Sequence, residues 1–94
     1  MGTYKLSREA EADLIRIHQW GAAQFGEAQA DAYFYAFFEH FKQLATDPLL
    51  YSETDIRPGY RKSLCGRDSV YYRINGDIVE IMAIIGQQDA KHWL

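Results

Sequence analysis

The sequence is poor in cysteine and in positive charge and has no long apolar run, and each shortage excludes a class of protein. Its single cysteine, Cys65, excludes an intramolecular disulfide, and we expect a small buried thiol. Ten basic and thirteen acidic residues give a formal net charge of −3, which argues against nucleic-acid binding driven by charge alone. No apolar run approaches the roughly 20 residues of a membrane span, and the N-terminus has no apolar leader region. We therefore expect a cytoplasmic protein without membrane contact or direct sequence-specific nucleic-acid binding.

What the sequence does contain is enough apolar material for one core. Hydrophobic residues make up 48% of the 94 residues, so one domain spanning 1–94 is expected. Charge is divided unevenly along the chain. Residues 1–56 hold four basic and nine acidic side chains, net −5, whereas residues 57–94 hold six basic and four acidic side chains, net +2. A local basic patch in the second part is compatible with the acidic total.

Three short strands are predicted in the segment 57–85. Residues 70–74 are mostly β-branched or aromatic, and residues 78–85 form a second, more apolar run. Between them, Asn75-Gly76-Asp77 contains the Asn-Gly pair that favours a type I′ hairpin turn, in which both residues have positive φ. Gly66-Arg67-Asp68 is predicted to form the preceding turn. The pattern predicts an antiparallel meander that carries several basic side chains.

Two helices are predicted ahead of these strands. A short edge strand at 3–6 leads to Ser7, which fits a helix N-cap, and apolar residues then recur on one face over about 7–24. Gly26 is a natural break. A second helix is predicted over about 27–45, and Asp47-Pro48 stops it because proline cannot continue a helix. The order β-α-α-β-β-β predicts an α+β fold, with a helical hairpin packed on a mostly antiparallel sheet of about four strands.

The second predicted helix is unusually aromatic. One stripe, formed by Tyr33, Phe37, Phe41 and Leu44, has the spacing of a core face, and Phe34 and Phe38 belong to an adjacent stripe. Two stripes are either a wide buried face or a core with an exposed apolar patch, and such patches usually mark partner sites. The hypothesis that follows is a partner helix docked on an exposed aromatic side, at residues Tyr33, Phe34, Phe37 and Phe38.

The residues that enzymes use are present only in scattered form. Metal-free RNA cleavage needs a positioned acid–base pair and a dense cluster of cations, and the candidates are Tyr71, Tyr72, His92, Arg61 and Arg73. No Gly-rich phosphate loop is present. The two helical histidines lack other ligands at metal-binding spacing, so no metal, cofactor or catalytic residue is expected; these histidines are His18 and His40.

The order of elements and several short motifs together resemble the RelE/ParE toxin superfamily of bacterial toxin–antitoxin modules. The motifs are YKLSREAEADLIRI at 4–17, FGEAQADAY at 25–33, LATDPLL at 44–50, DIRPGYRKS at 55–63 and SVYYRINGDIVEIMAIIG at 69–86. The A-x-x-D-L-x-x-I helix, the G-E-x-x-A-D helix start, the R-P-G-x-R strand start and the Y-R-I hairpin resemble the ParE branch. The pattern departs from many ParE-like chains at 86–89, where Gly-Gln-Gln-Asp replaces arginines.

The resemblance implies a toxin domain spanning 1–94, held inactive by a cognate antitoxin protein. For the ParE branch the implied target is DNA gyrase, which the toxin inhibits by binding and without catalysis. For the RelE branch the implied activity is cleavage of mRNA in the ribosomal A site, and this is the alternative. A third alternative is a non-toxic member that only binds an antitoxin and regulates its operon.

A gyrase-binding surface is expected in the basic second part of the chain. Basic side chains would supply charge, and Trp93 would supply an apolar anchor, because tryptophan and arginine often dominate binding energy. The hypothesised set is Arg61, Arg67, Arg73, Lys91, His92 and Trp93. The alternatives are that the arginines are ordinary solvated positions of a sheet, and that Trp93 folds back with Leu94 to cap the core.

Overall fold

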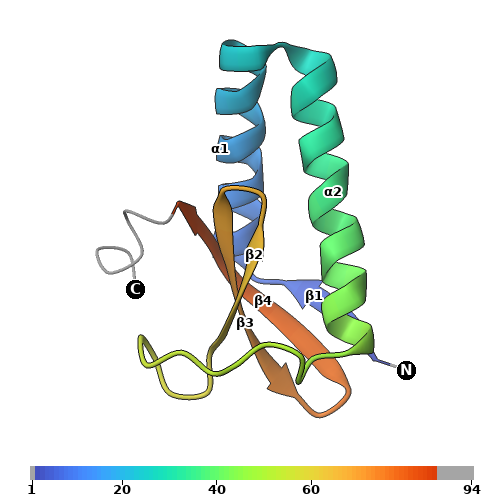
Figure 1. Ribbon diagram of the computed structural model, residues 1–94, viewed down its shortest axis with the longest axis vertical. Coiled ribbons are helices and arrows are strands. Elements are labelled where there is room, and N and C mark those ends of the chain that lie inside the picture. The colour runs from blue at the N-terminus through green and yellow to red at the C-terminus, as the bar shows by residue number, and fades with distance from the viewer. Residues whose placement is uncertain (1, 87–94) are drawn as a thin grey trace.

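The computed structural model describes residues 2–86 and has two helices packed side by side on one face of a four-stranded sheet (Figure 1). The fold class and the order of elements confirm the prediction, and each helix ends within one residue of its expected bounds. The turn that joins the two helices and the turn that joins the last two strands lie at opposite ends of the molecule (Figure 1). The elements are β1 (Thr3–Leu6), α1 (Arg8–Phe25), α2 (Glu27–Thr46), β2 (Arg61–Cys65), β3 (Asp68–Asn75) and β4 (Ile78–Gly86).

The sheet has the strand order β1-β4-β3-β2. The strands from β2 to β4 form the predicted antiparallel meander, and β1 pairs in parallel with β4, from Thr3 opposite Ile78 to Leu6 opposite Ile81. A β-bulge interrupts the β3–β4 register, since Tyr71 is opposite Ala83 whereas Tyr72 is opposite Ile81. The extra residue lies on β4, between these two pairs. It shifts the alternation of inward-facing and outward-facing side chains along β4, so that both Ile81 and Ile84 face the helices.

Ser7 joins the sheet to α1. Its hydroxyl accepts a hydrogen bond from the Ala10 amide at 3.0 Å, which confirms the predicted N-cap, and it donates to the Met82 carbonyl at 2.9 Å. The chain then turns into α2 at Gly26, whose φ of 92° lies in a region that L side chains rarely adopt. A strand edge thus fixes where α1 begins, and a glycine fixes where it ends.

Two side chains of α1 close the edge of β4 beyond the end of β1. Asp13 Oδ2 accepts from the Ile84 amide at 3.0 Å, and Arg16 Nη2 donates to the Ile84 carbonyl at 3.3 Å. Asp13 and Arg16 are also paired with each other at 3.4 Å. Because unpaired strand edges invite pairing with other chains, this clamp gives a physical reason for the Asp in the A-x-x-D-L-x-x-I helix.

The core lies between the helices and the sheet. Its fully buried members come from both helices and the three longer strands' inner faces, and Cys65 is buried among them, as expected. A smaller cluster of Tyr60, Tyr71, Ala83 and Ile85 lies on the opposite face of the sheet, where Ile56 packs against it. Within residues 2–86, no helix is long and apolar enough to span a membrane.

The two hairpin turns are where predicted, but one has a different conformation. Gly66 and Arg67 connect β2 to β3, and Gly66 has a φ of 61°. The β3–β4 loop is Gly76-Asp77, because Asn75 is already paired with Ile78. Only glycines have positive φ among the described residues, so the type I′ prediction for Asn75-Gly76 is wrong. Positive φ at the first loop residue alone, 62° at Gly76, is the pattern of a type II′ turn.

Candidate protein-binding surfaces

The four aromatic residues proposed to bind a partner have three different environments. Phe37 is 0% exposed and belongs to the core, so it is not available to a partner in this structure. Tyr33 is half-buried and its hydroxyl is held by the β2–β3 turn. Phe34 and Phe38 are half-buried and pack on the edge of the core. Of the expected set, Phe37 therefore belongs to the core, Tyr33 is hydrogen-bonded to a turn of the sheet, and Phe34 and Phe38 remain partly accessible at the surface.

Phe34 and Phe38 form the surface part of this set. Their ring centroids are 5.1 Å apart, and Phe34 also contacts the ring of His18 on α1 at 5.4 Å. His18 Nε2 lies 2.7 Å from Asp31 Oδ1, which joins the two helices beside these rings. Tyr35 is 67% exposed, and its ring lies 6.1 Å from that of Phe34. The structure therefore brings these rings together where the two helices meet. We call this surface the aromatic strip, and its residues are His18, Phe34, Tyr35 and Phe38.

Tyr33 tethers α2 to the β2–β3 turn. Its hydroxyl lies 2.8 Å from the Cys65 carbonyl and 2.8 Å from Asp68 Oδ2, and it accepts from the Arg67 amide at 3.2 Å. Burial, and then the hydrogen bond to the Asp68 carboxylate, raise the pKa of Tyr33. A Cβ on Gly66 would lie 2.5 Å from the Tyr33 hydroxyl oxygen, so this turn needs glycine for space as well as for φ.

The arginines proposed to bind gyrase do not form one patch. Arg61 is half-buried, and its Nη1 donates to the Tyr51 carbonyl at 2.6 Å; it shares a face with Ser63, which contacts α2. Arg73 lies on the opposite face of the sheet, and Arg67 is exposed in the β2–β3 turn. The remaining members of the set lie outside the described residues; they are Lys91, His92 and Trp93.

Arg73 belongs to an ion-pair network that sequence reasoning missed. Arg73 Nε donates to Glu80 Oε1 at 2.6 Å, and Lys5 Nζ lies 3.5 Å from Glu80 Oε2. The hydrogen bond from Arg73 lowers the pKa of the Glu80 carboxyl, and Lys5 adds to the effect. The network joins three neighbouring strands, β1, β4 and β3. No sequence signal could place Lys5 beside Glu80 before the parallel β1–β4 pairing was known.

Two tyrosines and one histidine that could support acid–base chemistry have little or partial exposure to solvent. Tyr71 and Tyr72 are 0% exposed, and burial raises the pKa of each phenol. His40 Nε2 lies 2.7 Å from Ser63 Oγ, but Ser63 is buried, and burial lowers the pKa of the imidazole. Residues 2–86 contain no group of three or more His, Cys, Asp or Glu side chains placed to hold a metal ion.

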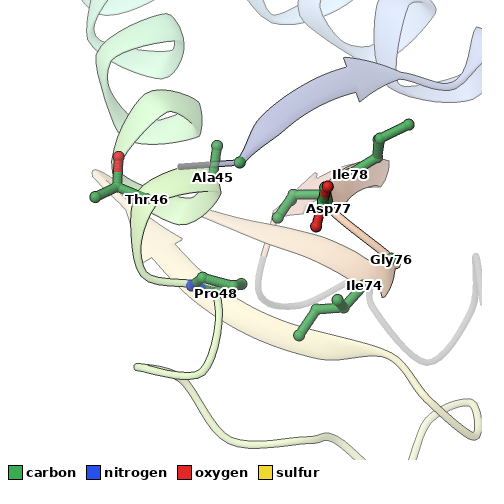
Figure 2. A pocket seen from close by; sticks show the side chains of 9 residues that line it. Ala45, Thr46, Pro48, Ile74, Gly76, Asp77 and Ile78 are labelled. Atoms are coloured by element: carbon green, nitrogen blue, oxygen red, sulfur yellow. The ribbon is translucent and has the colours of Figure 1, made fainter.

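A pocket of about 180 Å³ lies where the C-terminal end of α2 faces the β3–β4 turn (Figure 2). Figure 2 shows Pro48 on one side and Ile74 and Asp77 on the other. Gly2 also lines it, and a Cβ there would lie 2.6 Å from the Ala45 carbonyl oxygen. Asp77 is the one titratable side chain among its lining residues, and Thr46 adds a hydroxyl, so we assign this pocket no chemistry.

Known proteins are similar to this chain over nearly its whole length. The family model described as ParE toxin of type II toxin-antitoxin system, parDE, matches residues 4–90. The chain is 33% identical over 88 residues to Toxin ParE1 of Caulobacter vibrioides, covering 93% of this chain and 91% of that protein. It is 30% identical over 87 residues to Toxin ParE1 of Mycobacterium tuberculosis, covering 90% and 89% of the two chains.

A solved structure has the same fold. It is described as the chromosomal ParDE TA system from P. aeruginosa, and it matches with a TM-score of 0.80 and 23% identity over 92% of this chain and 96% of that chain. The sequence matches are to ParE toxins, which supports the expectation of a toxin that is not an enzyme over the RelE-type alternative. The chain belongs to the ParE toxin family of type II toxin–antitoxin systems.

Proposed function

We propose that this toxin acts in the bacterial cytoplasm by binding and inhibiting DNA gyrase, and that a cognate antitoxin neutralises it. The observation that carries the proposal is the ParE family match over residues 4–90. The buried Tyr71 and Tyr72, and the half-buried His40 whose Nε2 is engaged by the buried Ser63, support inhibition by binding, because they leave little acid–base chemistry for RNA cleavage. No observation on the described residues favours the RelE-type alternative.

The antitoxin site proposed here is the aromatic strip around Phe34 and Phe38. An amphipathic antitoxin helix would lay its apolar face along this strip, in the helix-in-groove mode of recognition. Phe37 is removed from the site because it is fully buried, and Tyr33 because its hydroxyl is committed to the β2–β3 turn. An extended part of the antitoxin would pair with a free edge of the sheet.

The gyrase contact proposed here uses exposed basic side chains of the sheet together with the C-terminal residues. Arg67 and Arg73 remain in the set as suppliers of charge, whereas Arg61 is already engaged by the Tyr51 carbonyl. Lys91 and His92 would extend the positive surface, and Trp93 would supply the apolar anchor.

A supercoiling assay with purified gyrase tests the function. The purified toxin should inhibit supercoiling, and an equimolar amount of cognate antitoxin should restore it. Deleting residues 90–94 should abolish inhibition while antitoxin binding persists. Primer extension on mRNA from expressing cells is the control for the nuclease alternative. New codon-linked cuts with gyrase unaffected would move the assignment to the RelE type, and antitoxin binding with neither activity would support the regulatory member.

A further inference from the structure

A second pocket lies on the face of the sheet turned away from the helices, where β1 passes into α1. Its volume is about 340 Å³. Lys5 and Arg73 are on this face because both contact Glu80, and Arg8 reaches the pocket from the first residue of α1. We call it the cationic pocket, and its lining residues are Lys5, Leu6, Ser7, Arg8, Arg73, Glu80 and Met82.

The charges of the cationic pocket are layered. Three cations and one carboxylate line it, which leaves a net +2 on a chain whose total is −3. The Glu80 side chain is only 11% exposed, whereas the side chains of Lys5 and Arg73 are 62% and 48% exposed. The negative charge therefore lies beneath the positive ones, and the surface that a partner meets is positive.

Arg8 has no evident role in stability. It is the first residue of α1, and the helix dipole disfavours a cation at a helix N-terminus. The next acidic residues, Glu9 and Glu11, are the kind that this position favours. No ion pair or side-chain hydrogen bond of Arg8 occurs within the described part of the chain. A cation placed against local preference and beside two others is the kind of departure from local rules that is typical of functional sites.

We propose that the cationic pocket binds an acidic segment of a protein partner, with a carboxylate between Arg8, Lys5 and Arg73 and an apolar side chain on Met82, which packs on this face of the sheet. The apolar Met82 side chain and the acidic total charge of the chain favour a protein segment over a phosphate backbone. The pocket faces away from the helices that carry the aromatic strip, so an antitoxin helix there leaves it open. The identity of that partner, DNA gyrase, is taken from the proposed function, and the inference rests on the proposed function in this respect only.

The test uses two double variants that remove the same charge. Lys5→Gln with Arg8→Gln neutralises the pocket and keeps the Arg73–Glu80 bond. Lys42→Gln with Lys62→Gln is the control, because neither lysine lines the pocket. The first probe is a ten-residue peptide of alternating glutamate and leucine, titrated into isotope-labelled full-length protein and followed by NMR. The second probe is a ten-nucleotide oligothymidylate, and the third is purified gyrase in a binding assay.

The peptide should shift the amide signals of the pocket residues, and the pocket variant should bind it and gyrase about tenfold more weakly, mainly through slower association. The control variant should stay within twofold of wild type. Arg8→Gln alone should unfold at the same urea concentration as wild type or a higher one, which a merely structural role of Arg8 would not predict.

Three results would overturn the pocket: peptide shifts located elsewhere, equal losses in both double variants, or tighter binding of the oligothymidylate than of the peptide. Retained gyrase binding by the pocket variant would also overturn it as the gyrase contact. Peptide binding in the pocket without any wild-type binding to gyrase would support the pocket and overturn gyrase as the partner. The failure of the site and the failure of the proposed function are thereby separated.

Discussion

Removing one hydroxyl, with Tyr33→Phe, should destabilise the fold without weakening the antitoxin site. The Tyr33 hydroxyl has one proton, so it donates to either the Cys65 carbonyl or Asp68 Oδ2, both at 2.8 Å, and it accepts from the Arg67 amide at 3.2 Å. The donated bond is part-buried and contributes about 1–1.5 kcal/mol, and the more exposed amide bond contributes roughly 0.5 kcal/mol. The expected loss is about 2 kcal/mol, or about 8–16 °C in Tm for a domain of this size.

Urea unfolding followed by circular dichroism measures this loss, and Tyr35→Phe is the matched control. Tyr35 is on the same helix and 67% exposed, so its variant should stay within about 0.5 kcal/mol of wild type. Calorimetry with the antitoxin should give the same affinity for Tyr33→Phe as for wild type. A loss no larger than that of the control would refute the tether, and a lost affinity in a stable variant would return Tyr33 to the antitoxin site.

Three further results are expected. Because the folded-state pKa of Tyr33 is raised, its contribution to stability is present below the ordinary tyrosine pKa of about 10 and is lost as pH rises above it. Tyr33→Phe should therefore lose less stability than wild type between about pH 10 and 12 in urea titrations, and parallel curves would contradict this. The folded-state pKa of Glu80 is lowered, so its contribution is present above about pH 4.3 and is lost as pH falls. Glu80→Gln should be less stable than wild type at pH 7 and should show a flatter decline below pH 5; an unchanged decline would assign the acid sensitivity to other carboxyls. Finally, Phe34→Ala and Phe38→Ala should each weaken antitoxin binding by at least tenfold in calorimetry, while Leu49→Ala, at an exposed loop residue, should not; unchanged affinity in both would place the antitoxin elsewhere.

The sequence predicted those parts of the fold that depend on local preference. The start of α1 at Ser7 and its end at Gly26 were predictable because N-capping and the φ angle are local properties. The strands were predictable because apolar residues alternate along them. The β3–β4 turn was mispredicted by one position because register decides which residues form the loop. Asn75 pairs with Ile78, and the positive φ is left to Gly76 alone.

The candidate site was less predictable because it depends on pairings between distant segments. Periodicity placed Phe34, Phe37 and Phe38 on α2, but only the packing of α2 against its neighbours decides that Phe37 is buried and the other two are half-buried. Arg61 and Arg73 point to opposite faces because Arg61 is opposite Tyr72 in the register, one residue from Arg73. A single sequence contains no signal for that register.

The parallel pairing of β1 with β4 has a kinetic consequence. Ser7 and Met82, whose hydrogen bond joins the start of α1 to β4, are 75 residues apart in the chain. At roughly 5–20 residues per second, the ribosome makes β4 about 4–15 s after β1. The helical hairpin and the β2–β3–β4 meander form from contacts between neighbours, but β1 must wait for the last strand, and closing so long a loop is entropically costly. The edge of the sheet and the cationic pocket therefore cannot form before β4 has been synthesised, although β1 and Arg8 are among the first residues made.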